Sequence, residues 1–132
     1  MEPRITLLTL GIDDLERSLV FYRDGLGLPT EGITGDVVFF KLQGAWLCLY
    51  ANASLARDAG FESIAEGFAG FSIAHNVRTR DEVDILLDQA QQAGATITSP
   101  AKELHWGGYV GYFTDPDGHV WEIAWNPQFW IE

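Results

Sequence analysis

The feature that most constrains the fold of this chain is an order of elements that occurs twice. Strand candidates at 4–12 and 70–77 are each followed by a helix pattern. Further strand candidates follow each helix, at 36–42 and 45–50 in the first half, with a short one between 29 and 33, and at 95–99, 109–114 and 120–125 in the second. Each half reads β-α-β-β-β, and this repeat in 132 residues predicts two copies of one supersecondary unit sharing a core.

Local signals mark where the two helices begin and end. The first starts at Asp13-Asp14-Leu15-Glu16, which resembles a capping box, and ends at Asp24-Gly25-Leu26-Gly27. The second starts with a Thr79-x-x-Glu82 box and ends at Gly94. Pro100 follows a few residues later. The segment 115–118, Asp-Pro-Asp-Gly, has the composition of a tight turn between two strands.

Length and composition favour one α+β domain over residues 1–132. Within it we expect a first βαβββ module at 4–50, a linker at 51–69, a second module at 70–127 and a tail at 128–132. The formal charge of -11 argues against nucleic acid and anionic membranes as partners. Cys48 is the single cysteine, which excludes an internal disulfide. Without a visible signal peptide or an apolar span of about 20 residues, a cytoplasmic location is expected.

Two segments, "DDLERSLVFYRDGLGLP" and "GGYVGYFTDPDGHVWEIAWNP", resemble the vicinal oxygen chelate superfamily, also called the glyoxalase/bleomycin-resistance/dioxygenase family. The resemblance covers about residues 4 to 127. It implies that the two modules form a half-open mixed β-barrel around a ligand cavity and that the chain is a homodimer. In the metalloenzymes of this family, His, Glu or Gln residues on the first and last strand of each half bind a divalent metal, which acts on the substrate.

The metal positions implied by the resemblance are only partly filled in this chain. Glu122 matches the ligand on the last strand, and the other three positions hold Leu7, Cys48 and Ser72. Leucine has no donor atom, and a metal site in a cavity normally uses three protein ligands. We therefore expect no cofactor, with a divalent metal as the less favoured alternative. His75 is interpreted as a core or edge histidine.

Strand alternation and the resemblance together predict which side chains face a ligand. Counting by twos from Glu122 and its counterpart Cys48 selects one face of each sheet, and the resemblance adds the loop that precedes a central strand. An aromatic, largely apolar surface with a few polar groups is typical of a small-molecule site. The predicted ligand cavity is lined by Thr9, Trp46, Cys48, Tyr50, Asn76, Trp106, Tyr109 and Glu122. Each aromatic residue among them is equally compatible with a place in the core or in a dimer interface.

The favoured function is binding of a small organic molecule, cationic or aromatic, in a dimer cavity with an incomplete metal site. One alternative is a metal-dependent lyase or dioxygenase of the glyoxalase type that uses Glu122. Another is a metal-free enzyme with Glu122 as general base, its pKa raised by burial. A catalytically silent domain that serves association stays open as well, because a fold does not fix a function.

Overall fold

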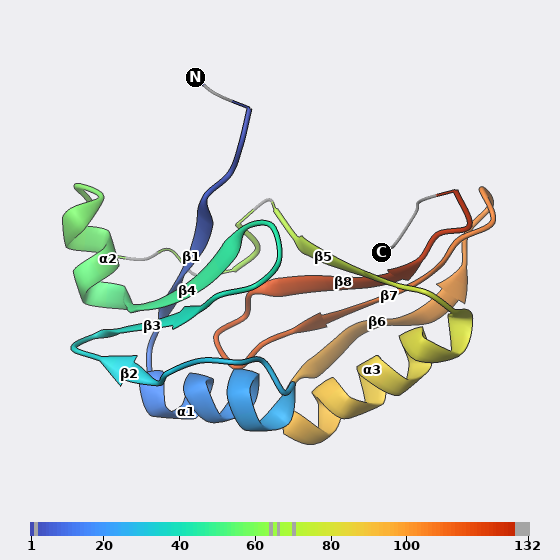
Figure 1. Cartoon of the computed structure of the whole chain (residues 1–132), viewed down its shortest axis with the longest axis horizontal. Helices are drawn as coiled ribbons and strands as arrows, with labels where there is room; N and C mark the ends of the chain where they lie inside the picture. Colours follow the sequence, from blue (N-terminus) through green and yellow to red (C-terminus); the bar gives the residue numbers. More distant parts are fainter. Residues whose placement is uncertain (2, 64, 66, 70, 129–132) are drawn as a thin grey trace. The chain divides into compact units, whose positions relative to one another are not determined.

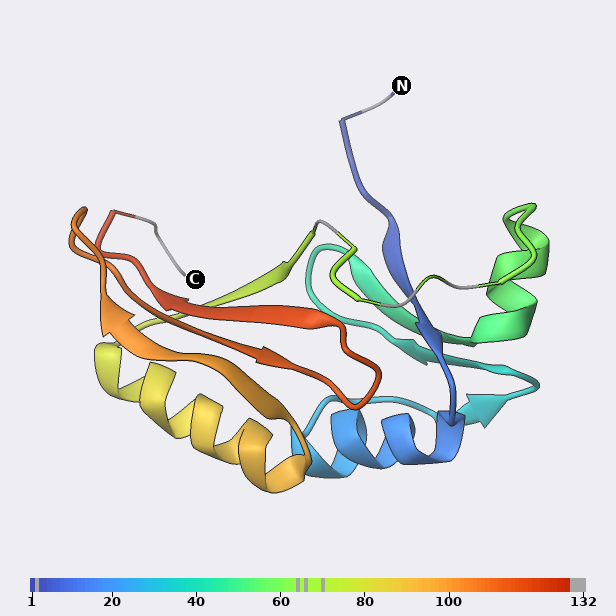
Figure 2. The same cartoon turned by 180° about the vertical axis from the view of Figure 1, so that it is seen from behind.

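The computed structural model describes residues 1, 3–63, 65, 67–69 and 71–128. The chain divides into two compact units, Met1–Glu66 and Gly67–Glu132, which Figures 1 and 2 show from opposite sides. Most of the segment expected to be a linker belongs to the first unit, because it forms helix α2, Asn52–Asp58. Tyr50 Oη donates to Asp58 Oδ2 at 2.6 Å and Ser54 Oγ donates to Asp36 Oδ2 at 2.6 Å. These contacts hold α2 to the neighbouring strands.

The first unit contains one four-stranded sheet. Its elements are β1 (Leu7–Ile12), α1 (Leu15–Leu19), the π-helix η1 (Val20–Gly25), β2 (Ile33–Thr34), β3 (Val37–Phe40) and β4 (Trp46–Ala51), followed by α2. The strand order is β1-β4-β3-β2, with β1 and β4 parallel and the other pairs antiparallel. Its core contains Tyr22 and Phe40, both fully buried, whose ring centroids lie 5.9 Å apart.

The second unit repeats this arrangement. Its elements are β5 (Ile73–Val77), α3 (Arg80–Ala93), β6 (Thr96–Glu103), β7 (Tyr109–Thr114) and β8 (Val120–Trp125). The order β5-β8-β7-β6, with β5 and β8 parallel, is the order of the first sheet one module later. The α+β fold built from two βαβββ modules is confirmed, and each module has its own mixed sheet.

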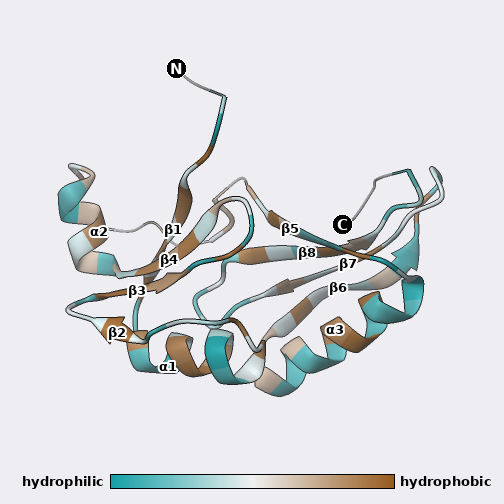
Figure 3. Ribbon diagram, in the orientation of Figure 1, coloured by the Kyte–Doolittle hydropathy of each residue, from teal (hydrophilic) through white to brown (hydrophobic). Residues whose placement is uncertain are grey.

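Helix α3 covers one face of the second sheet, and its hydrophobic and hydrophilic turns alternate in Figure 3. Val83, Leu87 and Ala90 are its buried side chains. The helix can approach β7 closely because Gly111 has no side chain. A Cβ at this position would lie 2.5 Å from Leu87 Cδ1 and 3.1 Å from the Ala101 backbone nitrogen. Glycine at 111 is therefore what lets α3 pack against the middle of the sheet.

The helix signals are confirmed at the second helix and shifted at the first. Thr79 Oγ1 accepts from the Glu82 amide, the Glu82 carboxylate accepts from the Thr79 amide, and Gly94 ends α3 with a φ of 114°. At the first helix the capping residue is Asp14, whose Oδ1 accepts from the Arg17 amide at 3.1 Å. Beyond Leu19 the chain continues as η1, whose wider turns end at Gly25.

Strand β6 differs from the sequence expectation, because it continues through Pro100 to Glu103 instead of ending at 99. It is an edge strand, and its pairing with β7 shifts register between Ile97 and Ser99 and again between Ser99 and Lys102. Edge strands and bulges are the places where a sheet tolerates the missing N–H of proline. Of the expected tail, residues 129–132 lie outside the described part of the chain. Within the described residues, no helix has the length and apolar character that a membrane crossing requires.

Candidate ligand-binding site

The hairpin of β7 and β8 places Tyr112 directly opposite Glu122. The turn between the strands is fixed locally: Asp115 Oδ1 accepts from the Asp117 amide at 2.9 Å and from the His119 amide at 2.8 Å. Gly118 completes the turn with a φ of 88°. The turn interpretation of 115–118 is thereby confirmed, and the turn sets the register that aligns the phenol with the acid.

Tyr112 and Glu122 form a short hydrogen bond. Tyr112 Oη donates to Glu122 Oε2 at 2.5 Å, and both side chains are half-buried. This bond raises the pKa of Tyr112 to about 12, with burial and the negative charge of Glu122 as smaller causes. A carboxylate in an apolar strand needs such a partner, and the phenol supplies it.

A cavity of about 610 Å³ lies beside this pair in the second unit. Its lining comes from the strands and from the segments before β5 and β8: Gly67, Phe68, Ser72, Thr98, Tyr112, Thr114, Gly118 and Val120. Tyr112 lines the cavity, and its phenol also donates a hydrogen bond to the Glu122 carboxylate, so this carboxylate lies next to the cavity. A largely apolar cavity of this size with few polar groups suits a small organic molecule.

In the first unit, the register places four of the predicted cavity residues on one face together with Leu7. Leu7 pairs with Trp46, Thr9 pairs with Cys48, and Tyr50 lies two residues further along β4. Cys48 is buried, and burial raises the pKa of its thiol, while a bond with Thr9 opposes that shift. Tyr50 uses its hydroxyl to bind Asp58. Trp46 also lines a separate cavity of about 420 Å³ at the end of this sheet.

Tyr109 does not share the face of Glu122. It pairs with Trp125, three residues beyond Glu122, and therefore points to the opposite side of the sheet. There its hydroxyl donates to Asp84 Oδ1 of α3 at 2.8 Å, and the Arg80 guanidinium lies 4.6 Å from its ring. These contacts attach α3 to β7, so Tyr109 belongs to the packing of the helix on the sheet.

The remaining predicted residues lie in different surroundings. Asn76 pairs with Ala124 and shares the face of Glu122. Trp106 folds over Gly108, where a Cβ would lie 2.0 Å from Trp106 Cη2, so its ring covers the backbone of its own loop. His75 pairs with Ile123 on the helix side of β5, which is an edge strand, and partial burial lowers its pKa.

The metal positions do not form a ligand set within either unit. In the first unit Leu7 offers no donor, and the buried Cys48 thiol disfavours the thiolate that a metal needs. In the second unit Glu122 is bonded to Tyr112, and Ser72 adds only a hydroxyl. Across the described ranges, no three His, Cys, Asp or Glu side chains are grouped so that they could hold a metal ion. The residues therefore do not fit a metal centre, and we derive no reaction step through one.

Tyr112 is the site residue that the sequence reasoning missed. The signal was present in the hairpin, because a turn centred near Asp117 makes Tyr112 and Glu122 equidistant from it. Phe39 and Lys41, which line the first cavity, were missed as well. Phe39 lies opposite Cys48 on the neighbouring strand, so the same counting across strands would have found it.

These features define a class of protein: paired βαβββ modules, each with a cavity beside its mixed sheet. The chain belongs to the Glyoxalase/Bleomycin resistance protein/Dioxygenase superfamily, whose family model matches residues 4–123.

Solved and curated relatives agree with this assignment. The chain is similar to a glyoxalase-related enzyme from Fulvimarina pelagi, with 36% identity and a TM-score of 0.90 over 98% of this chain and 92% of that one. It is 29% identical to a glutathione transferase, FosA, from Serratia marcescens, over 88% of this chain and 76% of the relative. It is 28% identical to a metallothiol transferase, FosB, from Lysinibacillus sphaericus, over 90% and 79%.

These relatives correct one expectation. The expectation that the chain uses no cofactor is wrong in the light of relatives that include a protein named metallothiol transferase. Leu7, Cys48 and Ser72 are poor ligands at three of the four positions, and this alone does not exclude a metal. The family implies a metal that the described side chains of either unit do not complete by themselves.

Proposed function

We propose that this chain binds a small organic molecule on the face of the second sheet that carries Tyr112 and Glu122. The observation that supports this function is the hydrogen-bonded pair at the edge of the 610 Å³ cavity. Membership of the superfamily agrees with it, because the module is one that relatives use around small molecules. The ligand is proposed to lie over the apolar lining, with its polar end at the pair.

The chemistry of the pair indicates which polar groups it prefers. An ionised carboxylate only accepts hydrogen bonds. The Tyr112 hydrogen is already directed at Glu122, so the phenol oxygen presents its lone pairs to the cavity. Both groups therefore offer acceptors, and a ligand with an ammonium, amide N–H or hydroxyl group matches them.

A screen of small amines, amides and alcohols by thermal shift, followed by calorimetric titration of the compounds that bind, tests this function. Glu122→Gln is expected to weaken binding about tenfold, because it removes a charged acceptor. Tyr112→Phe should weaken binding less. Tyr109→Phe is the matched control, because Tyr109 lies on the opposite face and should leave affinity unchanged. Equal affinities in the wild type and Glu122→Gln would contradict the proposal.

A second candidate is a metal-dependent transferase or lyase. The position of Glu122, which matches the family's ligand on the last strand, and the metallothiol transferase among the relatives favour it. Metal content after purification without chelators or a metal-affinity tag separates the two functions. Bound metal near one equivalent that disappears in Glu122→Gln would support the enzyme. Metal retained in Glu122→Gln would exclude Glu122 as a ligand.

We also propose that the chain forms a homodimer. Membership of the superfamily supports this, and exposed apolar side chains outside the two cavities, such as Leu8 on β1 and Val20 on η1, are candidates for the interface. Surfaces of this kind are common at interfaces between subunits. Light scattering coupled to size exclusion should give twice the chain mass of 14.7 kDa, and a monomer mass at micromolar concentration would contradict the dimer.

A further inference from the structure

We infer that the cavity of the first unit binds a planar organic anion, with Lys41 facing its carboxylate and Phe39 and Trp46 contacting its ring. The cavity has a volume of about 420 Å³ and is lined by Pro29, Thr30, Glu31, Gly32, Thr34, Phe39, Lys41 and Trp46. All eight residues belong to the first unit. The inference therefore goes beyond the proposed function, which concerns the second sheet.

Two aromatic rings supply the apolar part of this site. Phe39 and Trp46 come from the neighbouring strands β3 and β4, and their ring centroids are 6.5 Å apart at an interplanar angle of 64°. They are 41% and 38% exposed, which is unusual for side chains of this size on two paired strands. A flat ring that enters the cavity would cover both of them, and aromatic pairs gain more than the area they bury.

Lys41 supplies the charge. Its Nζ lies 5.4 Å from the centroid of the Trp46 ring. Among the described residues it has no hydrogen-bond or ion-pair partner, although acids outnumber bases by nineteen to eight. An ammonium held over an aromatic face in a cavity can pair with an anion and repels a second cation.

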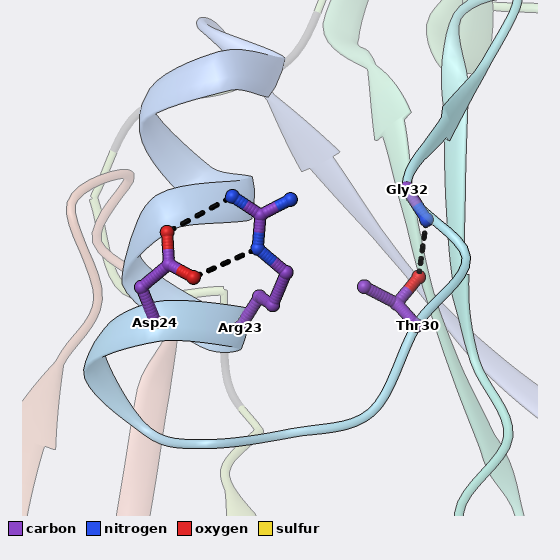
Figure 4. A network of polar contacts seen from close by, with 4 residues as sticks. All are labelled: Arg23, Asp24, Thr30 and Gly32. Atoms are coloured by element: carbon purple, nitrogen blue, oxygen red, sulfur yellow. Dashed lines mark hydrogen bonds and ion pairs between the residues drawn. The ribbon is translucent and has the colours of Figure 1, made fainter.

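The loop at the rim of the cavity is fixed by its own hydrogen bonds. The Thr30 hydroxyl donates to the Phe39 carbonyl at 2.6 Å and accepts from the Gly32 amide at 3.2 Å, the second of which Figure 4 shows. Arg23 does not compete with Lys41 for an anion, because its guanidinium holds Asp24 through two bonds of 2.8 and 2.9 Å (Figure 4). The cation that the cavity presents is therefore Lys41.

Glu31 is the residue that argues for the opposite ligand. It also lines the cavity, and an organic cation would pair with it. The position of Lys41 decides between the two: its ammonium stands over the aromatic surface that a planar cation would need. Lys41 favours an anionic ligand and Glu31 favours a cationic one. Substituting each residue in turn therefore reveals the sign of the ligand's charge.

The test uses three probes of one shape: naphthoate, neutral naphthamide and cationic naphthylmethylammonium. Each is titrated into the full chain while the indole N–H resonance of Trp46, assigned by its loss in Trp46→Phe, is followed by NMR. We expect naphthoate to bind more tightly than naphthamide, and the cation to bind least. Lys41→Met should weaken naphthoate about threefold to fivefold, the range of an exposed ion pair, and added salt should have a similar effect. Glu31→Gln should strengthen it.

Matched controls separate this site from general effects of charge. Lys102→Met removes the chain's other lysine, on β6 of the second unit, and should leave naphthoate affinity unchanged. Lys41→Arg keeps the charge and should retain most of the binding. Glu122→Gln should have no effect, so this site can fail or succeed independently of the proposed function. Absence of any naphthoate shift at Trp46, or tighter binding of the cation with a loss in Glu31→Gln, would overturn the inference.

Discussion

Tyr112 Oη lies 2.5 Å from Glu122 Oε2 across the β7–β8 hairpin, so the acid in the last strand has a phenol as its partner. Replacing Tyr112 with Phe removes this donor while keeping the ring. We expect the free energy of unfolding to fall by about 1 kcal/mol, the usual size for a half-buried hydrogen bond. Urea denaturation measures the change. Tyr50→Phe, whose bond to Asp58 is exposed, is the control and should cost less. An equal loss in both variants would contradict the role given to burial.

The same bond predicts how stability depends on pH. Tyr112 titrates near 12 in the folded chain, against about 10 for a tyrosine in an unfolded one. A raised pKa means that the stabilisation is fully present below pH about 10 and is lost as the pH rises through about 12. The free energy of unfolding should therefore decline more steeply between these values in the wild type than in Tyr112→Phe. Parallel curves for the two proteins would show that another group controls alkaline unfolding.

Gly111 and Leu87 predict a strong packing effect in the second unit. An added methyl group in Gly111→Ala would lie 2.5 Å from Leu87 Cδ1 and 3.1 Å from the Ala101 backbone nitrogen, so the Leu87 side chain must shift and the β6 backbone must give slightly. We expect a loss of about 1 to 3 kcal/mol in the free energy of unfolding, as for other overpacked cores. Combining it with Leu87→Ala makes room for the methyl. The double variant should therefore lose less than the sum of the two single losses, and simple additivity would argue against direct contact.

Cys48 is expected to react slowly with alkylating reagents. Burial raises the pKa of its thiol, so less of the reactive thiolate exists at neutral pH, and the side chain is only 4% exposed. Modification by iodoacetamide at pH 7 should be at least about tenfold slower in the folded chain than in urea. Since this is the only cysteine, the mass of the whole chain reports the reaction directly. Similar rates in both conditions would contradict the burial of Cys48.

Elements that depend on neighbouring residues were predictable from the sequence. The strands 109–114 and 120–125 have the bounds that alternation predicts, and the turn between them is closed by its own Asp115. The Thr79 capping box and the Gly94 helix end also follow from residues a few positions apart. The strand predicted at 95–99 continues to Glu103, because the cost of the missing N–H of Pro100 depends on whether the strand lies at an edge of the sheet.

The candidate site was predictable only in part. Counting by twos within a strand correctly grouped Thr9 with Cys48 and Asn76 with Glu122, because side-chain alternation is a property of a single strand. Tyr109 was predicted to line the cavity because it follows the loop that contains Trp106. The pairing of β7 with β8 turns its side chain to the other face of the sheet, where it contacts α3.

By itself, the sequence determined the duplicated βαβββ plan, the family and the position of an acid in the last strand, because these follow from local pattern and from likeness along the chain. The tertiary structure decided that this acid bonds to Tyr112 and that the pair lies beside a cavity. Tyr112, ten residues earlier, reaches Glu122 because strand pairing brings them opposite each other. Likewise, Lys41, Phe39 and Trp46 form one cavity because β3 and β4 pair side by side. Contacts between strands depend on register, which no single strand encodes.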